Sequence, residues 1–135
     1  MTRRYMLDTD ICIYALKQNQ AVLARLLVER PIDVGLSVIT EAELRTGAAK
    51  SASAPKTTRL LENFLRPLTV LEFTSDDALA YAVLRAKLEH AGTPIGPLDT
   101  LLAAQAVARK LTLVSHNERE FTRVAGLHLE NWAVV

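Results

Sequence analysis

Four carboxylate side chains follow or lie near apolar segments of this chain, and their spacing indicates metal chemistry. An apolar run over residues 4 to 8 ends in Asp8 and Asp10, and Glu43 and Asp99 occur in later segments with no lysine or arginine placed to neutralise them all. Carboxylates that gather in one place repel one another unless a cation lies between them. Carboxylate oxygens suit Mg²⁺ or Mn²⁺ better than zinc. The sequence therefore predicts a site for a hard divalent cation if the fold brings these acids together.

Each acid also has an ordinary structural explanation. Asp8 or Asp10 would cap a helix that begins near Asp10. Thr40 and Glu43 have the spacing of a capping box, and Asp99 would compensate the dipole of a helix in its first turn. These explanations treat the four acids as separate coincidences, whereas a metal site explains them together.

The order of the predicted elements decides whether the acids meet. Apolar and β-branched runs predict strands at about residues 4–8, 33–37, 68–73 and 111–114, with one or two short strand fragments between 127 and 135. Predicted helices alternate with them: one from Asp10, one ending at Pro31, then 40–50, 56–66, 75–90 and one from Leu98. This alternation indicates a single α/β domain over residues 1–135, with a central parallel sheet of four to five strands flanked by helices on both faces.

The parallel sheet would bring the polar residues to one edge. Ligands of such sheets bind beyond the carboxyl ends of the strands. Asp8 and Asp10 follow the first strand, and the segment 115–118 follows the strand at 111–114. Glu43 lies one turn into the helix after the second strand. Asp99 stands at the start of a helix whose other end leads into the strand at 111–114.

Bulk properties restrict the class of protein. The chain has 135 residues, half of them hydrophobic, and a net charge of +1, which neither requires nor excludes a nucleic-acid partner. Cys12 is the only cysteine, so an intramolecular disulfide and a cysteine-based zinc site are excluded, and its apolar neighbours predict a buried, inert thiol. Without an uncharged apolar stretch of about 18 residues, no membrane span is expected, and we expect a cytoplasmic protein.

Four motifs resemble one known family. The segments 6–13, 37–47, 92–99 and 113–121 are similar, in order and spacing, to those of the PIN domain and, more narrowly, of VapC, the toxin of bacterial VapBC toxin–antitoxin pairs. The resemblance implies an endoribonuclease that depends on Mg²⁺ or Mn²⁺ and leaves 5′-phosphate and 3′-hydroxyl ends. It assigns Asp8, Glu43 and Asp99 as metal ligands and catalytic residues.

Two positions depart from the usual pattern of the family. Asn117 occupies the catalytic position that often carries a fourth acid, so a second metal ion would bind weakly or only with substrate. Asp10 stands where the family often has asparagine, and its extra charge would partly compensate. Thr9, Asp10 and Ser115 are expected to support the ligands through hydrogen bonds.

Candidate RNA contacts come from the charge distribution. Five basic residues between Arg45 and Arg66 face a single acid in that stretch, although a solvated helical hairpin explains them equally well. The candidates for RNA binding are Arg45, Lys50, Lys56, Arg59, Arg85 and His116.

The resemblance also implies partners. A VapB antitoxin would neutralise the toxin by placing an extended segment in an apolar groove, for which Tyr14, Leu16, Leu44, Leu60 and Phe64 are candidates unless they belong to the core. A homodimer, and a higher oligomer with antitoxin, is expected. The RNA would be initiator tRNA or ribosomal RNA, and its cleavage would inhibit translation and growth.

Two alternatives remain open at the level of sequence. A degenerate PIN domain would bind a protein or RNA without cutting, which the presence of Asp8, Glu43 and Asp99 argues against. A phosphatase of the haloacid-dehalogenase type would use Asp8 and Asp10, with Ser37 as a phosphate ligand, but would leave Glu43 unexplained.

Overall fold

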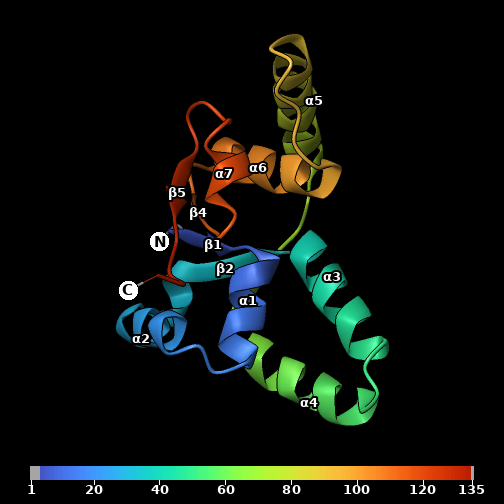
Figure 1. Ribbon diagram of the computed structural model, residues 1–135, viewed down its shortest axis with the longest axis vertical. Coiled ribbons are helices and arrows are strands. Elements are labelled where there is room, and N and C mark those ends of the chain that lie inside the picture. Colours follow the sequence, from blue (N-terminus) through green and yellow to red (C-terminus); the bar gives the residue numbers. More distant parts are fainter. Residues whose placement is uncertain (1–3, 135) are drawn as a thin grey trace.

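A parallel sheet lies at the centre of the protein, as the computed structural model shows for residues 4–134 (Figure 1). Its five strands are in the order β3-β2-β1-β4-β5, and every neighbouring pair is parallel. The strands are β1 (Tyr5–Leu7), β2 (Val34–Ser37), β3 (Thr69–Leu71), β4 (Thr112–Val114) and β5 (His128–Glu130). The predicted α/β class is confirmed; of the segment predicted to end in strand fragments, Val135 lies outside the described residues.

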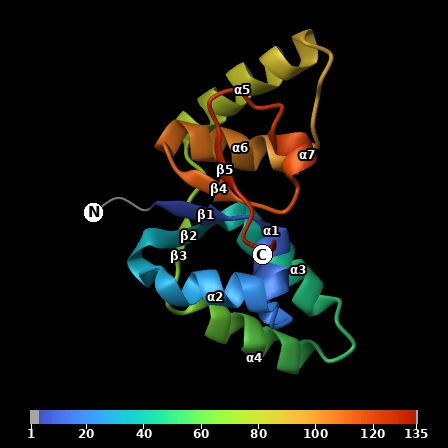
Figure 2. The same cartoon turned by 60° about the vertical axis from the view of Figure 1, so that its left-hand side comes forward.

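Helices cover both faces of the sheet (Figures 1 and 2). One face carries α1 (Thr9–Leu16), α2 (Gln20–Val28), α3 (Val38–Ala49) and α4 (Ala54–Leu65), and the other carries α5 (Ser75–His90), α6 (Pro97–Arg109) and α7 (Glu118–Phe121). A short 3₁₀ turn, η1 (Pro31–Asp33), precedes β2. Among the helices of residues 4–134 we find no candidate for a membrane span.

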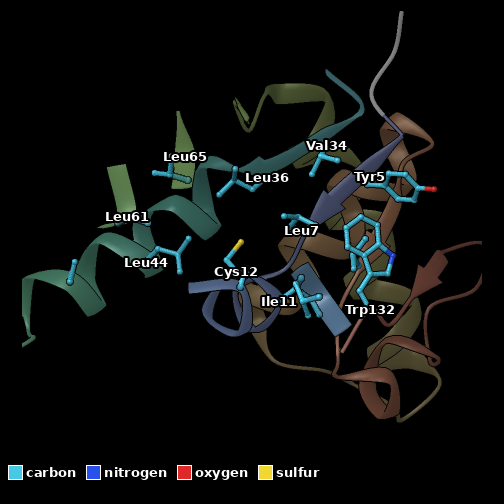
Figure 3. Close-up of a cluster of buried hydrophobic side chains, with 14 residues drawn as sticks. Tyr5, Leu7, Ile11, Cys12, Val34, Leu36, Leu44, Leu61, Leu65 and Trp132 are labelled. Atoms are coloured by element: carbon cyan, nitrogen blue, oxygen red, sulfur yellow. The ribbon is translucent and has the colours of Figure 1, made fainter. Parts of the chain in front are cut away.

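The alternation of side chains along β1 divides the core in two. Tyr5 and Leu7 face α1 to α4, where they pack with Trp132, whose ring lies 5.1 Å from that of Tyr5 (Figure 3). Met6 points to the opposite face and packs beneath α6 and α7. Cys12 is fully buried in the first cluster, as predicted, and this burial raises the pKa of its thiol.

The start of α3 differs from the prediction. The hydroxyl of Ser37 accepts a hydrogen bond from the backbone N–H of Ile39 at 3.1 Å, so the helix begins directly at the end of β2. Thr40 therefore lies inside the helix and is fully buried, and the capping box predicted for Thr40 and Glu43 is wrong. Glu43 is thereby freed for a different contact.

Two buried polar contacts hold α6 in place. The guanidinium of Arg109 binds the carboxylate of Asp77 at 2.7 Å and the carbonyl of Glu72, and Gln105 donates to the same carbonyl at 3.2 Å. Burial alone would raise the pKa of Asp77, but the hydrogen bond from Arg109 and others outweigh it and lower that pKa. These contacts hold the carboxyl-terminal end of α6 against the segment that leads from β3 into α5.

Candidate active site

Asp8 lies where β1 ends and α1 begins. Its carboxylate caps α1 by accepting from the backbone N–H of Thr9 at 2.7 Å, and it accepts from the hydroxyl of Ser115 at 2.8 Å. β1 pairs with β4 in parallel register, so the residue after each strand reaches the same edge. Asp8 and Ser115 meet for this reason, as the sheet prediction required.

Asp10 turns toward the end of β4. Its Oδ2 atom accepts from the backbone N–H of His116 at 3.0 Å and from the hydroxyl of Ser115 at 3.5 Å. Its other oxygen, Oδ1, is buried and has no hydrogen-bond partner in the described structure. Burial also raises the pKa of Asp10. A buried carboxylate oxygen without a donor is costly, which marks a place where a cation would be favourable.

Glu43 reaches the cluster from α3. The hydroxyl of Thr9 donates to its Oε1 atom at 2.6 Å, so one residue of α1 orients an acid 34 positions away in the chain. Thr9 and Ser115 thus each hold one carboxylate, Glu43 and Asp8 respectively, as expected for groups that support ligands.

Asp99 meets Asn117 and a further acid that the sequence analysis did not select. The amide nitrogen of Asn117 lies 3.4 Å from Oδ2 of Asp99 and 3.3 Å from Oε2 of Glu120. Asn117 therefore donates to both acids in this arrangement. The missed signal was spacing: Glu120 comes three residues after Asn117 in the first turn of α7, and such residues share one side of a helix.

The cluster is electrostatically frustrated: burial of its acids and their mutual repulsion both disfavour the charged carboxylates. Burial, followed by the charge of Asp10, raises the pKa of Asp8 to about 6. Burial, followed by a hydrogen bond with Glu120 and the charge of Asp8, raises the pKa of Asp99 to about 7. No ion pair in residues 4–134 joins a lysine or arginine to any of these acids or to Glu43. Neutralisation must come from protons or from a bound cation.

The donor set fits a hard divalent cation. The available ligands are carboxylate oxygens, which Mg²⁺ and Mn²⁺ prefer, and no group of residues 4–134 hydrogen-bonds Oδ1 of Asp10. Within the described part of the chain, no three acidic, histidine or cysteine side chains already form a ligand cage. The structure therefore shows a gathered set of donors rather than a preformed metal centre.

An open groove adjoins the cluster. Its cavity volume is about 560 Å³, and it is lined by α3 and the start of α6. The lining residues are Ile39, Ala42, Glu43, Thr46 and Leu98. Because Glu43 belongs to both the groove and the cluster, a bound chain could lie along the groove and reach the acids.

The predicted RNA contacts are dispersed. Arg45 is held by Glu41 at 2.9 Å and Glu62 at 2.6 Å, and Arg85 by Glu89 at 2.7 Å. Of all these candidates, only His116 is shown in contact with the cluster. Lys50, Lys56 and Arg59 are exposed, and residues 4–134 offer them no ion pair. Their role in RNA binding stays a prediction.

Comparison with known proteins shows the family of this chain. Residues 5–127 match the PIN domain family, to which the chain therefore belongs. Its relatives place it more narrowly among the VapC proteins. It is 34% identical to the tRNA(fMet)-specific endonuclease VapC of Salmonella typhimurium over 96% of this chain and 98% of that protein. It is 38% identical to ribonuclease VapC2 of Rickettsia felis over 95% and 97% of the two chains.

Solved structures give the same result. The crystal structure of VapBC2 from Rickettsia felis bound to a promoter DNA fragment matches with a TM-score of 0.91 and 36% identity, covering 98% of this chain and 99% of that one. DNA-bound VapBC from Salmonella typhimurium matches with a TM-score of 0.92 and 34% identity, covering 96% and 98%. The predicted family is confirmed. The phosphatase alternative has no support, and its proposed phosphate ligand, Ser37, caps α3 instead.

Proposed function

We propose that this chain is a VapC-type toxin, an endoribonuclease that cuts RNA with the help of Mg²⁺ or Mn²⁺ and thereby inhibits translation and growth. The observation that carries this proposal is the cluster of acids at the carboxyl edge of the sheet, to which residues 4–134 supply no cationic partner. Its support comes from relatives named as ribonucleases that align over nearly the whole chain. We also propose a cytoplasmic location, because the RNA substrate is there.

Asp8, Glu43 and Asp99 would hold the ion, with Asp10 and Glu120 beside them. A divalent cation at such a site neutralises phosphate charge and lowers the pKa of a bound water for in-line attack. Asp8 and Asp99 must lose their protons before their oxygens can bind a cation, so affinity falls as the pH falls below about 7.

The other residues position these acids. Ser115 donates to Asp8, and Thr9 donates to Glu43, which fixes the direction of the oxygens. Asn117 bridges Asp99 and Glu120 and keeps the two acids at one place although it carries no charge. Support of this kind is commonly worth about 10- to 100-fold in metal affinity or activity.

Initiator tRNA is the substrate we propose. Relatives from Salmonella typhimurium and Shigella flexneri, at 34% and 35% identity, are named tRNA(fMet)-specific endonucleases. The test is to incubate purified protein with total bacterial RNA in Mg²⁺, Mn²⁺ or EDTA and to map the ends of any product.

The expected result is one discrete product from initiator tRNA that forms only with metal and is lost in Asp8→Asn and Asp99→Asn. Glu72→Gln, which removes an exposed acid between β3 and α5 and keeps the backbone carbonyl, serves as the control and should cut normally. Equal degradation by all proteins would contradict the proposal. Metal binding without cleavage would favour the alternative of a binding module.

A VapB-type antitoxin is the partner we propose. Several solved structures that match this chain are VapBC complexes. Of the residues suggested for the antitoxin groove, Leu44 belongs to the core, whereas Leu60 on α4 is 52% exposed. The groove beside Glu43 offers a further apolar surface close to the acids. Co-purification with the antitoxin, and its loss on Leu60→Asp, would test this assignment.

We also propose a homodimer that uses the groove between α5 and α6. This groove has a cavity volume of about 580 Å³ and includes the exposed side chains of Leu79 and Val83. Asp76 and Lys87 lie at its two ends along α5. Two copies that pack antiparallel would bring Asp76 of one against Lys87 of the other, as a two-fold interface requires. Light scattering on Val83→Asp should show a monomer.

A further inference from the structure

The ring of His116 is fixed at the edge of the acidic cluster. Its backbone N–H donates to Asp10, and its ring packs edge-on against Tyr14, with 5.6 Å between centroids and 88° between planes. Its Nδ1 atom lies 3.0 Å from the amide nitrogen of Asn131. The residue is exposed, so the ring edge that carries Nε2 is the one left for a ligand.

The hydrogen bonds of Asn131 determine which ring nitrogen of His116 carries the proton. Oδ1 of Asn131 accepts from the backbone N–H of Ala133 at 2.9 Å, and Nδ2 donates to the carboxylate of Glu118 at 3.1 Å. With the amide flipped, Oδ1 of Asn131 would face the carboxylate of Glu118, and the amide N–H would face the backbone N–H of Ala133. An amide nitrogen only donates, so Nδ1 of His116 accepts, and the neutral ring carries its hydrogen on Nε2.

We propose that His116 positions the RNA by donating its Nε2–H to a phosphate oxygen of the strand beside the cleaved bond. This inference rests on the proposed function. Asp10 and Glu118 offer only acceptors at this edge, whereas an RNA strand presents acceptor oxygens and negative charge. Glu118 adds an unfavourable charge at this edge, and one of its oxygens is occupied by Asn131. His116 supplies the donor that the acids lack, in an orientation set before RNA arrives.

Three variants separate this role from packing. His116→Phe keeps a ring against Tyr14 but removes the donor, and His116→Gln restores a donor near the position of Nε2. Asn131→Ala leaves the imidazole in place but removes the amide donor that keeps its hydrogen on Nε2. His90→Phe, on an exposed histidine at the end of α5, is the matched control.

Steady-state cleavage of unfractionated bacterial tRNA with Mn²⁺ gives the first readout. We expect His116→Phe to raise KM by about tenfold or more, as for a lost hydrogen bond to a charged group, with the loss in KM rather than kcat. His116→Gln should recover part of the lost affinity. The KM of Asn131→Ala should lie between those of wild type and His116→Phe, and the KM of His90→Phe should match that of wild type. An unchanged KM in His116→Phe would overturn the inference while leaving the proposed function intact.

Two readouts do not need cleavage. ¹⁵N NMR of the imidazole at pH 8 should show hydrogen on Nε2 of His116 in wild type and a tautomer mixture in Asn131→Ala; hydrogen on Nδ1 in wild type would overturn the inference. In an Asp99→Asn background, fluorescence anisotropy should show weaker tRNA binding when His116→Phe is added, and equal binding would contradict the role. If wild type neither binds nor cuts tRNA, the proposed function and the inference fail together.

Discussion

Replacing Asp8 by asparagine should stabilise the metal-free protein while it abolishes activity. Asp8 is only 6% exposed, and its pKa is raised from 3.8 to about 6 in the fold. Below pH 3.8 the carboxyl is protonated in both states and carries no penalty. As the pH rises, Asp8 ionises first in the unfolded chain, because its pKa is lower there. Ionisation therefore favours the unfolded chain progressively, until the pH passes about 6 and Asp8 is ionised in the fold as well.

The magnitude follows from that shift. A difference of about two pKa units corresponds to about 3 kcal/mol at neutral pH and above. Asparagine cannot ionise, and its oxygen can still cap Thr9. Its amide would donate to Ser115, whose hydroxyl hydrogen would turn to Asp10. This rearrangement has a cost, so we expect a net gain of about 1–2 kcal/mol at pH 8 and little gain at pH 4.

Urea unfolding in EDTA at pH 4, 6 and 8 measures this difference, with the fluorescence of the buried Trp132 as the signal. Glu72→Gln is the control: it removes an exposed charge between β3 and α5, so its stability should change by no more than about 0.5 kcal/mol at each pH. If Asp8→Asn is no more stable than wild type at pH 8, or if its effect does not change with pH, the proposed electrostatic frustration is refuted.

Three further predictions follow from the contacts. Mn²⁺ should raise the Tm of wild type more at pH 8 than at pH 5.5, because protons leave the acids in that range, and Asp99→Asn should lose this shift in a thermal melt. Thr9→Val should lower Mn²⁺ affinity by about tenfold in calorimetry, since Glu43 loses its donor; equal affinity would contradict the orienting role. Arg109→Met should cost about 2–4 kcal/mol in urea unfolding because it leaves the buried Asp77 without its partner, and Arg109→Met with Asp77→Asn should recover part of that loss.

The fold could be predicted because its signals are local. Strand and helix periods alternate along the chain, and the rule for parallel sheets then places Asp8 and Ser115 at one edge. The same reasoning failed at α3, where Thr40 and Glu43 match a capping box in sequence. Ser37, at the end of β2, caps the helix first, and periodicity alone does not choose between two nearby caps.

The remaining site depends on contacts that no local pattern contains. The spacing of Glu120 from Asn117 indicates that the two share one side of α7, but the contact of Glu120 with Asp99 depends on the tertiary fold. The charge count between Arg45 and Arg66 likewise overlooked that Arg45 is held by two carboxylates, one of them, Glu62, 17 residues away. Distant ion pairs of this kind have no signature in a single sequence.

Calorimetric titration of the purified protein with Mn²⁺ at pH 7, in two buffers of different ionisation enthalpy, tests the central claim most directly. The account predicts saturable binding with release of protons from Asp8 and Asp99, and loss of both signals in Asp99→Asn. Absence of binding in wild type, or equal binding in wild type and Asp99→Asn, would contradict the claim that these acids form the metal site.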